Sequence, residues 1–263
     1  PQAIGREARS VGCHQGLAPV LDVSRDVRWG RTEETFGEDP YLVGVLGTRF
    51  VRGLQGEKRD LLATLKHYAG HSWSEGARNH APVHLGWREL NDVFLLPFEM
   101  AVKQARAGSV MPAYHDIDNE SCHASRHLLT EVLRGEWGFD GLIVADYIGI
   151  SLLYQHHNLA RDRAEAAALA FGAGLDIELP ADDCVAELGQ GEQGVRRLKG
   201  LGPESSLPQG ERAKERSFGL SRFPGDEQGP RQSGEGGAEL GMVRAVGGLG
   251  DLEGAAVAAD RPV

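Results

Sequence analysis

Short apolar runs that end in polar side chains alternate along the chain with longer segments of helical periodicity. The apolar runs lie at residues 16–23, 61–68, 109–115, 142–145 and 174–180. The segments of helical periodicity lie at residues 3–11, 41–54, 87–106, 125–137 and 162–171. A short apolar run bounded by turn residues is typical of a strand that is buried on both faces. Strands that alternate with helices in this way predict a parallel α/β sheet.

The run at residues 142–145 shows the pattern most clearly, because Gly141 precedes it and Asp146 follows it directly. In barrels and doubly wound α/β proteins, ligands bind at the carboxyl ends of the strands. An aspartate in this position is also a common N-cap of the next helix. The other strand ends help to decide between these alternatives. They carry further polar residues, which are Asp22, Lys66, His67, Tyr114 and His115. Repeated polar strand ends favour a barrel with a site at one edge.

The loop at residues 24–40 follows the first of these strands and contains Arg28 and Arg31. Long charged loops of this kind often bind ligands. A carboxylate near cationic donors suits sugar chemistry, because such groups bind vicinal hydroxyls while an aromatic side chain supports the ring face. We expect Trp29 or Tyr147 to be that aromatic platform.

A retaining glycosidase needs one carboxylate as nucleophile and one carboxylic acid as proton donor, about 5–5.5 Å apart. Asp146 fits the first role, and the opposite charges of Lys66 and Arg31 are expected to hold it ionised.

Composition restricts the class of partner. The chain has 263 residues, 41% of them hydrophobic and 25% charged, and a formal net charge of −10. An acidic chain of this kind argues against a nucleic-acid partner, for which a basic surface is usual. No apolar run approaches the roughly 18 residues that span a membrane, so we expect no membrane partner. We expect a soluble protein. The first residue is Pro1 and not Met, so we expect the true N-terminus to be missing, and whether the protein is cytoplasmic or secreted stays open.

Neither the cysteines nor the histidines give a strong metal signal. The 3 cysteines are far apart in the sequence and form no CxxC pair, so buried free thiols are expected. The pairs His67/His71 and His80/His84 have the spacing that binds zinc on a helix. Glycine and proline lie within these segments and disfavour a helix, so loop or pocket histidines are the preferred interpretation. We expect no metal and no cofactor.

The segment at residues 189–263 differs in composition from residues 1–188. It is rich in glycine, it mixes charges of both signs without periodicity, and its only aromatic residues are Phe218 and Phe223. Such a segment cannot bury enough apolar surface to offset its ordering entropy. We therefore expect disorder rather than a small second domain. Out-of-frame translation is a sharper hypothesis for the same segment, and translating the coding sequence in the other frames tests it.

Four motifs occur in an order that resembles one enzyme family. They are RDVRWGRTEETFGEDP, LKHYAGH, VMPAYH and GFDGLIVADY. Together they resemble the N-terminal barrel domain of family 3 glycoside hydrolases, which are retaining, exo-acting enzymes of the β-glucosidase and β-xylosidase type. The resemblance runs from about residue 3 to residue 182. It implies an incomplete (β/α)8 TIM-type barrel at residues 1–188, truncated at both ends, with a disordered C-terminal tail.

The resemblance also assigns roles to single residues. Asp146 matches the catalytic nucleophile of the family's (S/A)D(W/Y) motif. Arg31, Lys66 and His67 match residues that bind hydroxyls of the nonreducing-end sugar, and Tyr114 matches an aromatic residue of the same pocket. The implied substrate is a β-linked glucoside or xyloside, cleaved through a covalent glycosyl-aspartate intermediate.

The departures from the family pattern concern both ends of the barrel. The family's first barrel strand and a further substrate-binding aspartate have no counterpart before residue 16. The acid/base glutamate usually comes from a second domain, and no motif assigns that role to Glu136 or Glu178. The alternative function is therefore a catalytically impaired or sugar-binding barrel fragment that lacks its acid/base residue.

Overall fold

The computed structural model describes residues 1–190, 241–242 and 256–257. The α-helices are α1 (Gln2–Ser10), α2 (Pro40–Gln55), α3 (Trp87–Glu89), α4 (Leu96–Ala105), α5 (Gly149–Gln155), α6 (Arg163–Ala173) and α7 (Asp183–Gln190). The strands are β1 (Gln15–Gly16), β2 (Leu62–Tyr68), β3 (Ser109–Pro112), β4 (Asp116–Ile117), β5 (Glu120–Ser121), β6 (Leu142–Ile143), β7 (Gly241–Met242) and β8 (Ala256–Val257). Short 3-10 helices are η1 (Thr32–Glu34), η2 (His71–Trp73) and η3 (Glu75–Ala77), and π-helices are η4 (Leu90–Leu95) and η5 (His127–Glu136).

Four parallel strands of the central sheet, β1, β2, β3 and β6, lie side by side in the order in which they occur in the chain. Its order is β6-β3-β2-β1-β8-β7, and the pairs β1·β2, β2·β3 and β3·β6 are parallel. A parallel bridge between Val144 and Ile177 extends β6 toward the next apolar run. A doubly wound sheet reverses its order at a switch point, whereas the order of β1, β2, β3 and β6 continues in one direction. The mixed α/β fold with a parallel sheet is therefore confirmed, and the incomplete (β/α)8 barrel stays an expectation.

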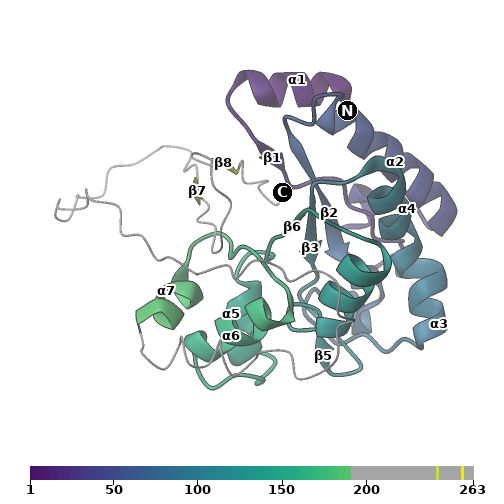
Figure 1. The fold of residues 1–263 in the computed structure, drawn as a ribbon. Coiled ribbons are helices and arrows are strands. Elements are labelled where there is room, and N and C mark those ends of the chain that lie inside the picture. Colours follow the sequence, from purple (N-terminus) through teal and green to yellow (C-terminus); the bar gives the residue numbers. More distant parts are fainter. Residues whose placement is uncertain (191–240, 243–255, 258–263) are drawn as a thin grey trace, which may run out of the picture.

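Helices α2 and α4 pack against each other and against β2. Figure 1 shows α2 and α4 side by side along the sheet, with α5 and α6 beyond β6. Helix α2 begins where Asp39 accepts a hydrogen bond from the Leu42 amide, and Pro40 occupies its first position. Both features are typical of helix starts. Gly44 of α2 lies where a Cβ atom would meet the Met100 sulfur at 2.4 Å, so the glycine permits the close packing of α2 on α4.

Several expected elements form with changed boundaries. The expected strand at residues 16–23 is regular only at β1, and it returns to the sheet at a bridge between Val20 and Lys66. Pro19 interrupts it because proline has no amide hydrogen to donate. The expected long helix at residues 87–106 contains the π-helix η4 immediately before Pro97. Proline has no amide hydrogen to donate, and its ring clashes with the preceding turn, so it disturbs the α-helical pattern. The π-helical turn before Pro97 accommodates this disturbance.

A buried amide links the inner strands at the end opposite the candidate site. Gln15 Nε2 donates to Thr64 Oγ1 at 2.9 Å and to Ser109 Oγ at 2.9 Å. The three side chains come from β1, β2 and β3, and all are buried. Buried polar groups need partners, so this amide satisfies two hydroxyls and fixes the spacing of three strands.

The C-terminal segment is described only in part. Strand β8 pairs with β1 in parallel and with β7 in antiparallel orientation. The remainder of residues 191–263 lies outside the described residues, so the disorder and the out-of-frame origin expected for it stay predictions. Within the described part of the chain, no helix is long and apolar enough to cross a membrane.

Candidate functional site

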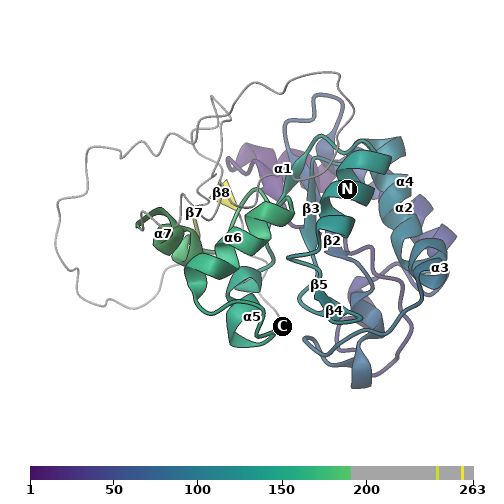
Figure 2. The same cartoon turned by 60° about the horizontal axis from the view of Figure 1, so that its bottom comes forward.

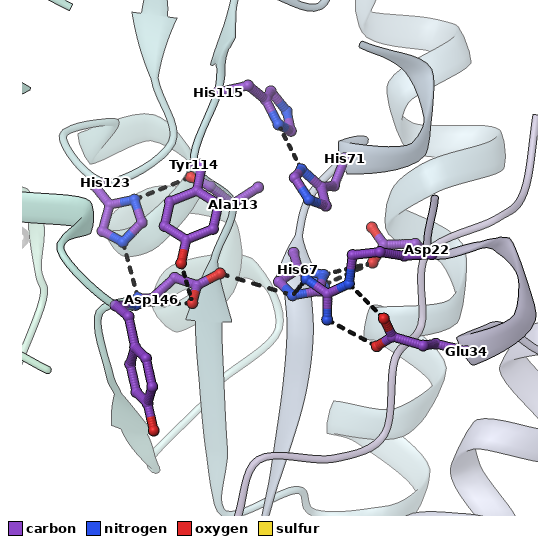
Figure 3. A network of polar contacts seen from close by, with 11 residues as sticks. Asp22, Glu34, His67, His71, Ala113, Tyr114, His115, His123 and Asp146 are labelled. Carbon is purple, nitrogen blue, oxygen red and sulfur yellow. Dashed lines mark hydrogen bonds and ion pairs between the residues drawn. The ribbon is translucent and has the colours of Figure 1, made fainter. Parts of the chain in front are cut away.

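The polar strand ends meet at the carboxyl edge of the sheet. Figure 3 shows Asp22, His67, Tyr114 and Asp146 directed toward one another, and the hairpin β4–β5 lies beyond the same edge in Figure 2. Asp22 follows the β1 run, His67 belongs to β2, Tyr114 follows β3 and Asp146 follows β6. The sequence predicted this meeting because the carboxyl ends of neighbouring parallel strands lie at one edge.

Asp146 is a buried carboxylate with one oxygen held and one oxygen available. Its Oδ1 accepts from the Tyr114 hydroxyl at 2.9 Å and from the Tyr147 amide at 2.8 Å. Its Oδ2 is buried and has no hydrogen-bond partner among the described residues. Burial raises the pKa of Asp146, while the Tyr114 hydroxyl, the Tyr147 amide and the charges of Lys66 and Arg31 oppose that rise. Lys66 and Arg31 thus favour the ionised form of Asp146, while burial, which is the largest effect, sets the net direction of the shift.

His67 is a neutral acceptor at the centre of the network. Its Nδ1 lies 2.8 Å from Asp22 Oδ2, and its Nε2 lies 2.9 Å from Arg31 Nη1. A guanidinium only donates, so Nε2 is the acceptor and Nδ1 carries the proton donated to Asp22. Burial and the nearby Arg31 charge hold the pKa of His67 well below its usual value. The 3.7 Å approach of Nε2 to Asp146 Oδ2 is therefore a contact between two acceptors and not an ion pair.

A bidentate ion pair with Glu34, here called the fork, fixes the orientation of Arg31. Its Nε and Nη2 donate to the two oxygens of Glu34 at 2.6 and 2.8 Å, while Nη1 reaches His67. A bidentate pair holds a guanidinium in one plane, so Glu34 orients Arg31 toward the site. Asp22 receives a second hydrogen bond, from the His67 amide to its Oδ2 at 3.1 Å, while its Oδ1 has no partner among the described residues.

Tyr114 and Lys66 complete the set of predicted site residues. Burial and the Asp146 charge raise the pKa of Tyr114, so its hydroxyl keeps the proton that it donates to Asp146. Lys66 is 7% exposed, and its charge acts on both Asp146 and Glu34. The structure thus brings together Arg31, Lys66, His67, Tyr114 and Asp146 around a common centre.

A second layer of histidines supports this centre. The rings of His71 and His115 are stacked, and His115 Nε2 donates to the Ala69 carbonyl at 3.0 Å. His71 also meets the edge of Trp29, whose exposed fraction is 3%. The expectation that Trp29 is an open platform for a sugar ring is therefore wrong, because Trp29 is buried against His71. Tyr147 remains the candidate for that role.

Three polar residues of this region were missed as site residues. Glu34 had a usable signal, since it follows Arg31 at the i, i+3 spacing of helical ion pairs. His71 had a signal only as part of the zinc-like His67/His71 pair. The two residues are not arranged to share a metal, because His67 uses both ring nitrogens for Asp22 and Arg31. His123 had no signal, because it occupies a short loop after β5 with no motif around it.

The chemistry that this arrangement supports is recognition of a neutral polyhydroxy ligand. Cationic donors and unpartnered carboxylate oxygens face the same centre, and vicinal hydroxyls both donate and accept. Comparison with known proteins identifies the family. The family model for the glycosyl hydrolase family 3 N terminal domain matches residues 1–209. The chain belongs to glycosyl hydrolase family 3.

Named relatives of this family 3 chain include both glucosidases and xylosidases. A β-xylosidase of Formosa agariphila is 42% identical over 181 residues, which cover 66% of this chain and 25% of that protein. A periplasmic β-glucosidase of Salmonella typhimurium is 34% identical over 177 residues, which cover 66% of this chain and 23% of that protein. The chain therefore spans about a quarter of the length of these curated relatives.

Solved structures agree with the family. A β-glucosidase from Erythrobacter marinus is 38% identical with a TM-score of 0.70, and the match covers 75% of this chain and 28% of that one. An exo-β-xylosidase of family 3 solved with a xylobiose aziridine probe is 26% identical with a TM-score of 0.64, at 75% and 28% coverage. Family 3 membership and the parallel α/β architecture are thus established together.

Proposed function

We propose that the chain carries the sugar-binding and nucleophilic half of a retaining, exo-acting β-glycosidase of the β-glucosidase or β-xylosidase type. The observation that carries the proposal is the state of Asp146. One oxygen of this buried carboxylate is held by the Tyr114 hydroxyl and the Tyr147 amide, and the other has no partner among the described residues. A nucleophile requires this combination of fixed orientation and an available lone pair.

In the proposed reaction, Asp146 Oδ2 attacks the anomeric carbon of a β-glycoside. The new bond joins this oxygen to the sugar while the bond to the aglycone oxygen breaks, and water later releases the sugar with overall retention. Arg31, Lys66, His67 and Tyr114 are the proposed substrate-binding residues. Arg31 and Lys66 donate to hydroxyls, while Asp22 Oδ1 accepts from them. Tyr114 keeps Asp146 Oδ1 engaged, so that Oδ2 is the reacting atom.

The proton donor for the leaving group is not among the carboxyl groups of this network. Asp22 is bonded to His67, and Glu34 forms the fork with Arg31. Glu178 is also engaged, because it accepts the amides of Cys184 and Val185 at the start of α7. These contacts favour the second candidate function, a sugar-binding or catalytically impaired fragment that turns over only substrates with activated leaving groups.

A mechanism-based label tests the proposal. Dinitrophenyl 2-deoxy-2-fluoro-β-glucoside and the matching xyloside carry leaving groups that need little acid assistance, so the nucleophile alone decides the outcome. We expect the chain to gain the mass of one fluorosugar, and peptide mapping to place it on Asp146. Asp146→Asn is the matched control, because it keeps the size of the side chain and removes the nucleophile.

The outcomes separate the two candidates. A labelled Asp146 together with turnover of cellobiose or xylobiose, whose leaving groups need acid assistance, supports the glycosidase. A labelled Asp146 without that turnover supports the catalytically impaired fragment. A folded chain that binds glucose or xylose in calorimetry but takes no label supports the sugar-binding fragment. A folded chain that neither binds sugar nor reacts refutes both.

A further inference from the structure

The pattern of backbone hydrogen bonds between β3 and β6 changes at the end of the sheet where the candidate site lies. Within the sheet, the Val144 amide donates to the Val110 carbonyl at 2.9 Å. Amides two residues apart on a strand point to the same neighbour, so the Asp146 amide is directed to the β3 side as well. It does not reach the backbone of β3. Instead it donates to Nε2 of His123 at 3.1 Å.

The other nitrogen of the same ring returns to β3. His123 Nδ1 lies 3.0 Å from the Ala113 carbonyl, which only accepts, so Nδ1 carries the proton and Nε2 is the acceptor. His123 is 0% exposed, and burial lowers its pKa to about 3. The imidazole therefore stays neutral in one tautomer at physiological pH, as both hydrogen bonds require.

We propose that His123 is a positioning residue for the nucleophile, a hydrogen-bonded bridge that replaces the ladder bond between the ends of β3 and β6. The bridge joins the residue before Tyr114 to the backbone of Asp146. The Tyr114 hydroxyl donates a hydrogen bond to Asp146 at 2.9 Å. The His123 imidazole therefore completes a closed circuit of hydrogen bonds that includes Tyr114 and Asp146. Figure 3 shows the imidazole between Ala113 and the Asp146 backbone. This inference rests on the proposed role of Asp146 as nucleophile.

Close packing of Gly149 against the ring supports the same role. Gly149 lies so close to His123 that a Cβ atom there would be 2.2 Å from Nε2. Gly149 also closes the turn after the nucleophile, because its amide donates to the Asp146 carbonyl at 2.8 Å. The imidazole thus contacts the backbone at Asp146 and at Gly149 and restricts the movement of the segment between them.

The test compares four single variants of the whole chain by the kinetics of fluorosugar labelling. His123→Leu removes both hydrogen bonds, and His123→Gln retains an amide that both donates and accepts. Gly149→Ala retains His123 but displaces its ring, because the added methyl group would overlap with it. Tyr68→Phe is the matched control, because it removes one buried hydrogen bond, from the Tyr68 hydroxyl to the Leu128 carbonyl.

We expect His123→Leu and Gly149→Ala to lower the maximal labelling rate by about 10- to 100-fold, the cost of a small misplacement of a reacting group. The inhibition constant for the probe should change by less than about 3-fold, since the hydroxyl-binding groups lie elsewhere. His123→Gln should recover most of the rate, and Tyr68→Phe should keep it.

Two results overturn the proposal. One is an unchanged maximal rate in folded Gly149→Ala and His123→Leu. The other is a loss of the same size in Tyr68→Phe, which would make the effect a general consequence of core damage. If His123→Leu does not fold, Gly149→Ala gives the decision. Failure of the proposed function is distinct, because the unaltered chain would then take no label.

Discussion

The hydroxyl of Tyr114 offers the sharpest test of how the site controls its carboxylate. Tyr114→Phe removes the 2.9 Å hydrogen bond to Asp146 Oδ1 and leaves the ring in place. That hydrogen bond lowers the pKa of Asp146, against the burial that raises it. Loss of the hydroxyl therefore raises the pKa further, and a larger fraction of the carboxyl is protonated at a given pH.

The magnitude follows from the contacts that remain. A hydrogen bond to a charged group contributes about 1.5–3 kcal/mol, and about 1.4 kcal/mol corresponds to one pH unit. The Tyr147 amide still donates to Oδ1, and Lys66 and Arg31 still act on the carboxylate. Because the bond is only part-buried, the lower end of the range applies, and we expect a shift of about one pH unit.

The assay is the pH dependence of the labelling rate constant divided by the probe's inhibition constant. Its acidic limb reports the ionisation of the free nucleophile. In Tyr114→Phe this limb should move to higher pH, with a smaller loss of rate at its plateau. Tyr41→Phe is the control, since Tyr41 is 65% exposed on α2. A variant that still labels but has an unmoved acidic limb would refute the reasoning.

Four further results are expected. Asp146→Asn should raise the melting temperature at pH 7, with a gain that shrinks toward pH 4, because burial raises the pKa of Asp146 and its charged form destabilises the fold; equal melting temperatures at pH 7 would contradict this. Arg31→Lys should weaken sugar binding by about 10-fold or more in calorimetry, since an ammonium cannot form the fork with Glu34; unchanged affinity would count against the fork. Gln15→Leu should lower the free energy of unfolding by about 1–3 kcal/mol, because two buried hydroxyls lose their partner, and denaturant titration measures this while labelling per folded molecule stays constant. Acid should destabilise the chain below about pH 6, by up to about 1.4 kcal/mol per pH unit for each histidine that is buried in the neutral form; denaturant titrations at pH 7 and pH 5 measure this, and equal stabilities would contradict it. The histidines concerned are His67, His71, His115 and His123.

The parts of the site that could be predicted from the sequence are those that the strand ends determine. An apolar run followed by a polar residue places that residue at the carboxyl edge, and this rule located Asp22, His67, Tyr114 and Asp146. Strand lengths were less predictable. The run at residues 16–23 is as apolar as a buried strand, yet Pro19 confines its regular pairing to β1.

The remaining site features depend on tertiary contacts that leave no periodic trace. His123 bridges two strands from a loop, and its function depends on a single tautomer and a neighbouring glycine. The burial of Trp29 could not be predicted either, because a tryptophan in a polar loop is equally compatible with a platform for a sugar ring and with packing on His71. Sequence pattern alone carries no information on which residue covers which ring.

The one-directional strand order has a consequence for how the site assembles during synthesis. The parallel pairs β1·β2, β2·β3 and β3·β6 join strands that follow one another along the chain, such as Gln15 with Leu62 and Thr64 with Ser109. Synthesis runs from the N-terminus, so this order allows the four strands to join the sheet in turn. Arg31, His67 and Tyr114 precede β6, so the hydroxyl-binding groups are synthesised first. Asp146 and its contact with His123 come last, and the reactive oxygen is positioned only when β6 docks on β3.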